Sequence, residues 1–322
     1  MTYSRIAGTG RYLPEKILTN FDLEKMVDTT DEWIRTRTGV ERRHCVAPDQ
    51  TTSDMCVEAA KAAMEDAGVK PEDIEMVVIG TTSPDLIFPN AATLVQHRLG
   101  IPACPCIATE EACTSFIYGL SIADKFIKSG EASTILVIGA ECITKLVDWN
   151  DRNTCVLFGD GAGAVVLKAS DEPGILATHL GADGQYKELL YYPVGASKEL
   201  HLAGTDAASI TMVGNEVFKV AVKTLGNVAV EVLEKAGVSQ DDLDWLVPHQ
   251  ANIRIIQATA KRLDLPMEKV ILTVQDHGNT SAASVPMALD VGIRDGRIKQ
   301  GQLVLMEAFG GGFTWGSVLM RL

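Results

Sequence analysis

One cysteine in this chain stands where a nucleophile would be expected. Cys113 lies in ATEEACTSF, just before a predicted helix over about residues 114–129. The unpaired N–H groups at a helix N-terminus stabilise a thiolate, which is the reactive form of cysteine. By position alone, a buried and unreactive cysteine is the commoner case. The residues that the fold brings to Cys113 therefore decide whether it reacts.

Two polar residues of the second half could complete a site. His249 follows the apolar run and the proline of WLVPHQAN, so it stands at the end of a strand, where an imidazole can donate to a substrate carbonyl or exchange a proton. Asn279 lies in DHGNTSAAS, and its amide is a neutral donor without basic character. The alternatives are a core histidine bonded to a carbonyl and a turn asparagine. We interpret His277 as structural or supporting.

Glycine-rich segments supply a further chemical possibility. AFGGGFTWG (308–316) has three consecutive glycines after a predicted strand, which lets a backbone N–H face a ligand as an oxyanion hole requires. Phosphate binding is the alternative, but neither GxxxxGK[ST] nor GxGxxG occurs. GDGAGAVVL (159–167) predicts tight packing between elements and no chemical role.

The elements that would carry these residues alternate along the whole chain. Helical stretches precede short Val/Ile-rich runs, as in VEAAKAAMEDAG with EMVVIG and VAVEVLEKAG with DWLVPH. This alternation predicts an α/β fold with strands buried on both faces. The stretch 167–202, rich in Gly and Asp, is the best candidate for a junction.

The two halves of the chain resemble each other. Four pairs of segments match in the same order, namely 62–80 with 231–249, 90–102 with 252–266, 133–141 with 302–310, and 161–168 with 315–322. We therefore predict two similar halves, 1–170 with the nucleophilic cysteine and 171–322 with the histidine and asparagine. A pseudo-twofold axis would bring the loops of Cys113 and Asn279 together at the centre.

The composition excludes several classes of function. A formal net charge of -13 disfavours nucleic acid or an anionic membrane as the main partner. No run approaches the roughly 20 apolar residues of a membrane span, and we expect a cytoplasmic protein. Seven cysteines, an odd count in mostly apolar contexts, indicate reduced thiols. Cys104 and Cys106 lack a second ligand pair at metal-binding spacing, so we predict no metal.

These motifs resemble those of one family, the β-ketoacyl-acyl-carrier-protein synthase III family of thiolase-fold condensing enzymes. The resemblance covers essentially the whole chain, and the spacing of the Cys, His and Asn motifs is specific to the group. Besides the segments quoted above, it is carried by GTGRYLPEKILTN (8–20), DEWIRTRTGVERR (31–43), GTTSP (80–84) and GNEVFKVAV (214–222).

The resemblance implies a five-layered αβαβα fold, a homodimer, and a catalytic set of Cys113, His249 and Asn279. Cys113 would take an acyl group from acyl-CoA, with acetyl-CoA as the expected primer, while the thioester oxygen rests on the N–H groups of Cys113 and Gly312. Malonyl-acyl-carrier protein would then lose carbon dioxide, and His249 with Asn279 would stabilise the enolate. This reaction initiates type II fatty-acid synthesis, and the resemblance implies no cofactor.

The resemblance also implies binding residues. Trp33 and Arg152 would hold the adenine of CoA between them, with Thr29 and Arg37 near the nucleotide and Asn215 near the pantetheine arm. A half-buried helix residue and solvated arginines are the alternative interpretation. The residues expected to line an acyl pocket are Thr81, Leu86, Ile87 and Phe88, with packing across the dimer deciding which primer fits.

A basic helix face could receive the carrier protein. Arg254, Ala258, Lys261 and Arg262 share one face of a predicted helix in NIRIIQATAKR, and the apolar residues lie on an adjoining face. With Lys219 they would form a local basic patch for an acidic carrier protein. An ordinary charged surface is the alternative.

The chain departs from the family pattern beside the cysteine. Glu110 and Glu111 stand where small or apolar residues are usual, and Ser115 replaces a usual glycine. Carboxylates beside a thiol disfavour the thiolate unless they point away or are paired. We expect both glutamates at solvent-facing or interface positions.

Three other functions remain open at this point. A starter synthase of secondary metabolism would keep the same three residues and accept another primer or nucleophile. A thioesterase or simple acyltransferase would need an activating base, and Asn279 in place of an acid argues against it. An inactive partner subunit would lack the catalytic set, which is present here.

Overall fold

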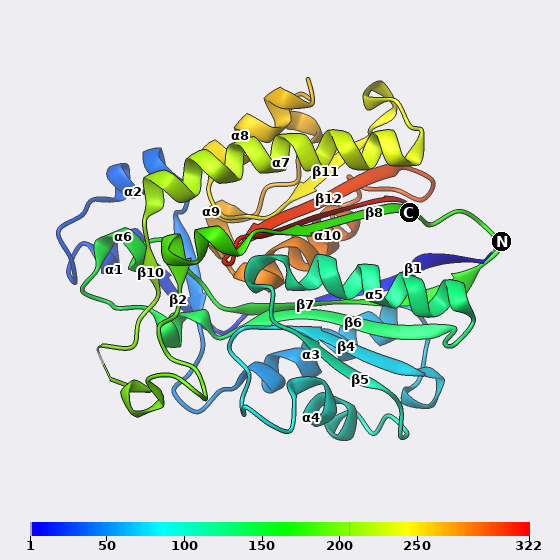
Figure 1. Cartoon of the computed structure of the whole chain (residues 1–322), viewed down its shortest axis with the longest axis horizontal. Helices are drawn as coiled ribbons and strands as arrows, with labels where there is room; N and C mark the ends of the chain where they lie inside the picture. The colour runs from blue at the N-terminus through cyan, green and yellow to red at the C-terminus, as the bar shows by residue number, and fades with distance from the viewer. Residues whose placement is uncertain (1, 206) are drawn as a thin grey trace.

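Two β-sheets lie face to face, with helices between them and on both outer sides (Figure 1). The computed structural model describes residues 2–205 and 207–322. These layers have the order αβαβα, as the family resemblance implied. From one outer layer to the other, the helices are α3 (Thr52–Asp66) with α4 (Ala91–Arg98), then α5 (Ser115–Ser129) with α10 (Ser284–Arg294), then α7 (Gly214–Ala236) with α8 (Ile253–Arg262).

The first sheet has the strand order β1-β7-β6-β4-β5. Strand β4 is parallel to both of its neighbours, and β7 is antiparallel to both of its own. The strands are β1 (Tyr3–Tyr12), β4 (Met76–Gly80), β5 (Cys106–Thr109), β6 (Thr134–Glu141) and β7 (Gly161–Ser170). Strand β5 is therefore a free edge in the monomer.

The second sheet repeats the topology of the first. Its order is β11-β12-β13-β8, with β11 parallel to β12 and the other pairs antiparallel, which is the arrangement of β4-β6-β7-β1. Its strands are β8 (Ile175–Ala182), β11 (Trp245–Pro248), β12 (Leu303–Gly310) and β13 (Thr314–Arg321). The four predicted segment pairs fall on equivalent elements, so the internal repeat is confirmed. The division of the chain at 170/171 stays a prediction.

Three hydrophobic clusters hold the layers together. The central one contains Phe116 of α5 and Leu289 of α10 and fills the space between the sheets. One outer cluster packs α3 and α4 on the first sheet, and the other packs α7 and α8 on the second. All eight residues of β6 and of β12 are buried, as expected for inner strands covered on both faces.

Local sequence signals explain where several helices begin and end. Thr51 caps α3 and forms a capping box with Asp54. Gly237 ends α7 in the left-handed conformation, as predicted for a C-cap. In β7, a Cβ on Gly163 would lie 2.7 Å from the backbone nitrogen of Met287, so the glycines of GDGAGAVVL do allow close packing, here against α10.

Short elements gather at one end of the layers, on the left of Figure 1. They are β2 (Lys16–Thr19), α1 (Asn20–Leu23), α2 (Asp31–Thr38), β3 (Arg42–Cys45), α6 (Arg152–Cys155), β9 (Leu190–Tyr191) and β10 (Thr211–Met212). Among the described residues, no helix is both long enough and apolar enough to cross a membrane.

Candidate active site

A cavity of about 680 Å³ brings the three candidate catalytic residues together. Cys113, His249 and Asn279 all line it, although they come from three separate loops. Its outer wall includes Trp33 of α2 and Met212 of β10, so the short elements form the approach to the cavity. The predicted convergence of the two halves on one site is thus visible in the structure.

Cys113 lies in the 3₁₀ turn Ala112–Thr114, which leads directly into α5. Ala112 has a φ of 49°, a strained value for a residue with a side chain. Burial, with a smaller contribution from the charge of Glu141, raises the pKa of the Cys113 thiol to about 12, and a hydrogen bond with the Ser281 hydroxyl acts in the opposite direction. The resting residue is therefore a thiol, and its proton must leave before the sulfur can attack.

His249 follows β11 and is held by two contacts. Its backbone N–H donates to the carbonyl of Glu307 at 2.8 Å, and its Nδ1 lies 2.6 Å from the Ser284 hydroxyl. Burial lowers the pKa of His249 to about 3, so the imidazole is neutral near pH 7. When Ser284 donates to Nδ1, the ring hydrogen is on Nε2.

Asn279 is fixed through its backbone and through its side-chain oxygen. Its N–H donates to the carbonyl of Leu157 at 2.8 Å, and its carbonyl accepts from Gly159 at 3.0 Å. The side-chain Oδ1 accepts from the N–H of Ser281 at 2.9 Å. This bond engages the acceptor end of the amide and leaves the NH2 group as the donor to the cavity that Asn279 lines.

Glu141 and Ser281 form part of the site and were missed from the sequence. Glu141 ends β6 and is fully buried, and Ser281 donates to it at 3.2 Å. Burial raises the pKa of Glu141 to about 7, against the opposing effect of its hydroxyl and backbone donors. The only sequence signal was an acidic residue at the end of an apolar run.

In the glycine-rich turn after β12, the residue that lines the cavity is Gly311, next to the predicted Gly312. Gly311 lines the cavity, and a Cβ placed on it would lie 3.7 Å from the Cβ of Ala112. Gly312, the predicted oxyanion donor, is not among the lining residues and has a φ of 132°. The strand β12 ends at Gly310, which brings the first residue of the turn to the cysteine loop.

The predicted CoA-binding residues lie mostly together at the cavity mouth. Trp33, Arg37 and Asn215 line the cavity. The guanidinium groups of Arg37 and Arg152 lie 5.6 Å and 5.2 Å from the centroid of the Trp33 ring. Thr29 is half-buried and does not line the cavity.

The predicted carrier-protein residues lie beside the same opening. Arg254 lines the cavity and lies 5.2 Å above the ring of Phe218. Lys219 on α7 is exposed and pairs with Glu216 at 2.8 Å. Lys261 and Arg262 are exposed near the end of α8, whose Ile255, Ile256 and Thr259 are buried as the helical pattern predicted.

The four predicted acyl-pocket residues do not line the cavity of this chain. Thr81 is buried and donates to Glu141 at 3.3 Å, while its neighbour Thr82 lines the cavity. Leu86, Ile87 and Phe88 are 50%, 66% and 83% exposed. They directly follow Asp85, which forms hydrogen bonds with Ser53 of α3.

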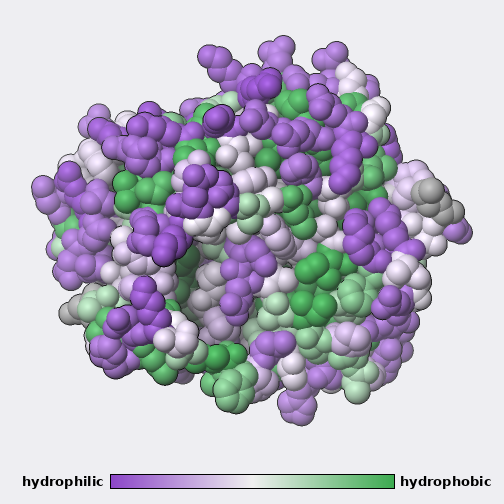
Figure 2. Space-filling model, viewed as in Figure 1, coloured by the Kyte–Doolittle hydropathy of each residue, from purple (hydrophilic) through white to green (hydrophobic). Residues whose placement is uncertain are grey.

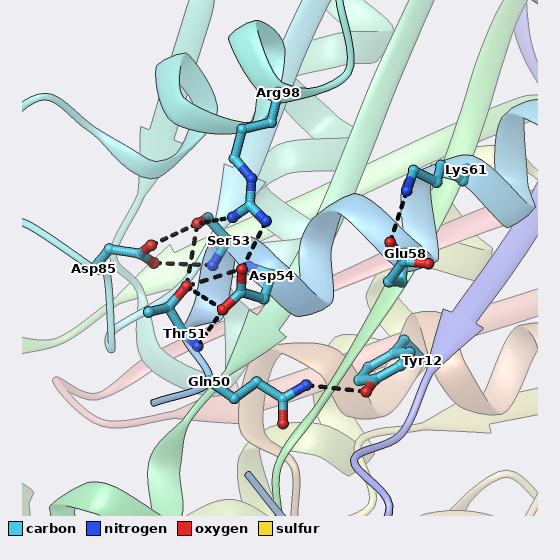
Figure 3. A network of polar contacts seen from close by, with 9 residues as sticks. All are labelled: Tyr12, Gln50, Thr51, Ser53, Asp54, Glu58, Lys61, Asp85 and Arg98. Carbon is cyan, nitrogen blue, oxygen red and sulfur yellow. Dashed lines mark hydrogen bonds and ion pairs between the residues drawn. The ribbon is translucent and has the colours of Figure 1, made fainter. Parts of the chain in front are cut away.

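Figure 3 shows that network at the N-terminus of α3. Asp85 accepts from the backbone N–H of Ser53 at 2.9 Å and from its hydroxyl. Arg98 of α4 donates to the same hydroxyl at 2.7 Å and pairs with Asp54 at 2.6 Å. These contacts hold Asp85 in place, so the exposed apolar residues 86–88 extend from a fixed point of the chain.

The three residues near Cys113 that depart from the family pattern, Glu110, Glu111 and Ser115, do not line the cavity. Glu110 is exposed and Glu111 is half-buried, and neither lines the cavity. Burial, followed by the charge of Glu110, raises the pKa of Glu111. Ser115 is fully buried against Gly80, since a Cβ on that glycine would lie 2.6 Å from the Ser115 Cβ. The absence of a side chain at Gly80 thus makes room for the larger residue at 115.

Comparison with known proteins points to one family. The model of the 3-oxoacyl-acyl-carrier-protein synthase III family matches residues 108–184, and the model of its C-terminal region matches residues 233–322. A β-ketoacyl-acyl-carrier-protein synthase III of Xanthomonas campestris pv. campestris is 61% identical over 319 residues, which are 99% of this chain and 98% of that protein.

Solved structures show the same fold. The 3-oxoacyl-acyl-carrier-protein synthase III of Aquifex aeolicus superimposes with a TM-score of 0.93 at 48% identity, over 99% of this chain and 100% of the other. The priming β-ketosynthase of the R1128 polyketide biosynthetic pathway superimposes with a TM-score of 0.94 at 36% identity, over 99% and 96% of the two chains.

Proposed function

This chain belongs to the β-ketoacyl-acyl-carrier-protein synthase III family, also called 3-oxoacyl synthase III, and from that membership we propose how its own residues carry out the condensation. The enzyme is a condensing acyltransferase that starts type II fatty-acid synthesis. The proposed reaction joins an acyl-CoA primer, acetyl-CoA first, to malonyl-acyl-carrier protein with loss of carbon dioxide. The observation that carries the assignment of residues is the meeting of Cys113, His249 and Asn279 in one cavity.

The first half-reaction moves the acyl group to Cys113. The sulfur attacks the thioester carbonyl, and the negative oxygen of the tetrahedral intermediate accepts hydrogen bonds from the backbone N–H groups of Cys113 and Gly311. We prefer Gly311 to Gly312 because only Gly311 lines the cavity. Collapse of the intermediate expels the CoA thiolate and leaves a thioester on Cys113.

The second half-reaction uses the two neutral donors. The malonyl thioester loses carbon dioxide, and the negative charge moves to its carbonyl oxygen as an enolate. Nε2–H of His249 and the amide of Asn279 stabilise that oxygen, and the enolate carbon attacks the acyl group on Cys113. A protonated imidazole is not required, which agrees with the low pKa of His249. The reaction as proposed needs no cofactor, because acyl-CoA is itself a substrate.

The CoA part of the primer is proposed to enter between the short elements at the cavity mouth. Trp33 offers a ring face for the adenine, and the guanidinium of Arg152 on that face would move to the far side of the base. Arg37 and Asn215 line the same passage and would contact the nucleotide and the pantetheine arm. Thr29, which does not line the cavity, would contact only the outermost part of the nucleotide.

The carrier protein is proposed to dock beside the same opening. Arg254, Lys261 and Arg262 project from α8, and Lys219 projects from α7 next to it. An acidic partner would find this local positive patch despite the net charge of -13 on the chain. Arg254 also lines the cavity, so the docking surface and the entrance for the malonyl arm are continuous.

We propose a homodimer formed through the free edge of the first sheet. Figure 2 shows hydrophobic residues gathered on the face over α5. Ile122 and Phe126 of α5 and Ile107 of β5 are only partly buried in the monomer. The exposed tip 86–88 adjoins this face, since Asn90 donates to the carbonyl of Cys106 in β5 at 3.4 Å. A second copy would cover the edge and the apolar tip together, and would complete the acyl pocket with Leu86, Ile87 and Phe88.

Incubation with acetyl-CoA and malonyl-acyl-carrier protein tests the proposed function. The expected products are carbon dioxide and acetoacetyl-acyl-carrier protein in equal amounts. A panel of acetyl, butyryl, isobutyryl and octanoyl CoA then defines the primer. Turnover with none of these primers would contradict the assignment.

A further inference from the structure

Glu141 is a buried carboxylate, and a single residue, Ser281, lies between it and the nucleophile Cys113. It is fully buried and accepts from the backbone N–H of Thr82 at 3.1 Å, from the hydroxyl of Thr82 at 3.0 Å, and from the hydroxyl of Ser83 at 2.6 Å. Among the described residues it forms no ion pair. The titratable groups that face it are the thiols of Cys113, Cys56 and Cys142.

Ser281 connects this carboxylate to the nucleophile. Its hydroxyl donates to Glu141 at 3.2 Å and also interacts with the Cys113 sulfur, whose pKa it lowers. Its backbone N–H holds Asn279 at 2.9 Å. Ser281 adopts a φ of 49°, a conformation that costs energy in a residue with a side chain and that is concentrated at functional sites.

We propose that Glu141 takes the proton of Cys113 through the Ser281 hydroxyl when the acyl group is loaded, and returns it after condensation. In the first half-reaction, the S–H bond breaks, the Ser281 hydroxyl passes its own proton to Glu141 and receives that of Cys113, and the sulfur bonds to the acyl carbon. The CoA thiolate leaves and takes a proton from solvent. In the second half-reaction, the thiolate released from the acyl group regains its proton from Glu141 by the same path.

The arrangement favours this proton acceptor over the alternatives. A thiolate beside an ionised Glu141 would place two negative charges in a buried site, whereas transfer between them keeps one. His249 is a poor acceptor because burial lowers its pKa to about 3 and its Nδ1 already contacts Ser284. Burial raises the pKa of Glu141 to about 7, which brings it closer to that of a thiol. The proposal rests on Cys113 being the acylated residue.

Single-turnover acylation by acetyl-CoA, followed by quenching and intact-mass measurement, tests the proposal. Glu141→Gln keeps the size of the side chain but cannot accept the proton, and Ser281→Ala interrupts the path while keeping the backbone N–H to Asn279. Both variants should acylate about 100-fold more slowly at pH 7. Ser129→Ala, at an exposed serine that ends α5, is the control and should stay near the wild-type rate.

The pH profile separates proton transfer from a structural role. In the wild type, the acylation rate should rise with pH as Glu141 ionises near pH 7 and then level off. In Glu141→Gln it should keep rising with pH, because only solvent can remove the thiol proton. Carbon dioxide release by the preformed acyl-enzyme should remain near wild type in both variants, since it depends on His249 and Asn279.

Two results would overturn the proposal. One is acylation by Glu141→Gln and Ser281→Ala at the wild-type rate with an unchanged pH profile. The other is an equal loss of acylation and of carbon dioxide release in Ser281→Ala, with a melting temperature like that of the wild type, which would indicate positioning alone. Failure of the wild type to acylate at Cys113 would instead contradict the proposed function.

Discussion

At the scale of single residues, the two half-reactions depend on different side chains. His249 and Asn279 contact the developing enolate in the proposed second half, but neither holds the Cys113 proton. We expect His249→Ala and Asn279→Ala each to slow carbon dioxide release by about 100-fold or more, because each removes one donor to the enolate oxygen. Acylation of Cys113 should change much less.

Rapid-quench measurement of both steps checks this separation. His97→Ala, an exposed histidine on α4, serves as the control and should change neither step. Equal loss of acylation and decarboxylation in the His249 variant would show that the histidine also acts on the thiol.

Glu307 gives a residue-scale prediction about stability. Both of its carboxylate oxygens are buried and without a hydrogen-bond partner among the described residues, and burial raises its pKa to about 8. Between its ordinary value of 4.5 and about 8, the folded state holds one more proton at this group than the unfolded state does. Its contribution to the free energy of unfolding therefore falls as pH rises through that window.

Glu307→Gln removes this titration and should raise the melting temperature more at pH 9 than at pH 5. Thermal unfolding across this pH range checks the expectation, with Glu65→Gln, an exposed residue of α3, as the control. A melting-temperature difference between Glu307→Gln and wild type that stays constant from pH 5 to pH 9 would contradict it.

The sequence was sufficient to predict which three residues meet in the cavity, but not the residues that surround them. Cys113, His249 and Asn279 each stand in a local motif with a visible strand or helix boundary. Glu141 and Ser281 are 140 positions apart, and only the packing of one half against the other makes them neighbours. For the oxyanion hole we predicted Gly312 and now propose Gly311, because the sequence has no signal for where β12 ends within three consecutive glycines.

At the scale of elements, two equivalent turns each pack on a strand of the opposite half of the chain. One turn holds Cys113, and the other holds Ser281. The turn Ser281–Ala283 before α10 lies on β6, where a Cβ at Gly139 would lie 2.2 Å from the carbonyl oxygen of Ala282. The turn that holds Cys113 lies on β12, where a Cβ at Gly310 would lie 2.8 Å from the Cys113 nitrogen. The repeat predicted that the two turns lie near the centre of the molecule. It did not predict which strand residues they contact, because this depends on the missing side chains at Gly139 and Gly310.

Gly139→Ala tests this contact. The added methyl group should displace Ser281 and destabilise the fold by about 2 kcal/mol, since it meets backbone rather than a flexible side chain. Gly184→Ala, where a Cβ meets nothing within 4 Å, should cost less than about 0.5 kcal/mol. Denaturant unfolding measures both changes, and equal stabilities of the two variants would contradict the assigned role of Gly139.

At the scale of the whole molecule, the repeat explains why the site is central and why a second copy is expected. The two halves bury their loops against each other, and β5 stays at an open edge of the first sheet, paired only with β4. The sequence indicated the halves through matching segments. It could not indicate which edge remains open, because that depends on strand order rather than on composition.

Phe88→Asp tests the proposed dimer. The Phe88 side chain is 83% exposed in the monomer, so the change should spare folding while weakening association. Light scattering should give twice the chain mass for the wild type and a lower, concentration-dependent mass for the variant. Phe21→Asp, at a phenylalanine that is 62% exposed on α1, should leave the dimer intact. A monomeric wild type would contradict the dimer.

The most direct test of the account is the fate of one acyl group on Cys113. Intact-mass spectrometry after incubation with acetyl-CoA should show one acetyl adduct on the wild type and none on Cys113→Ala. The adduct should persist until malonyl-acyl-carrier protein is added and then disappear as acetoacetyl-acyl-carrier protein forms. An adduct that hydrolyses without the malonyl thioester, or that forms on Cys113→Ala, would contradict the central claim.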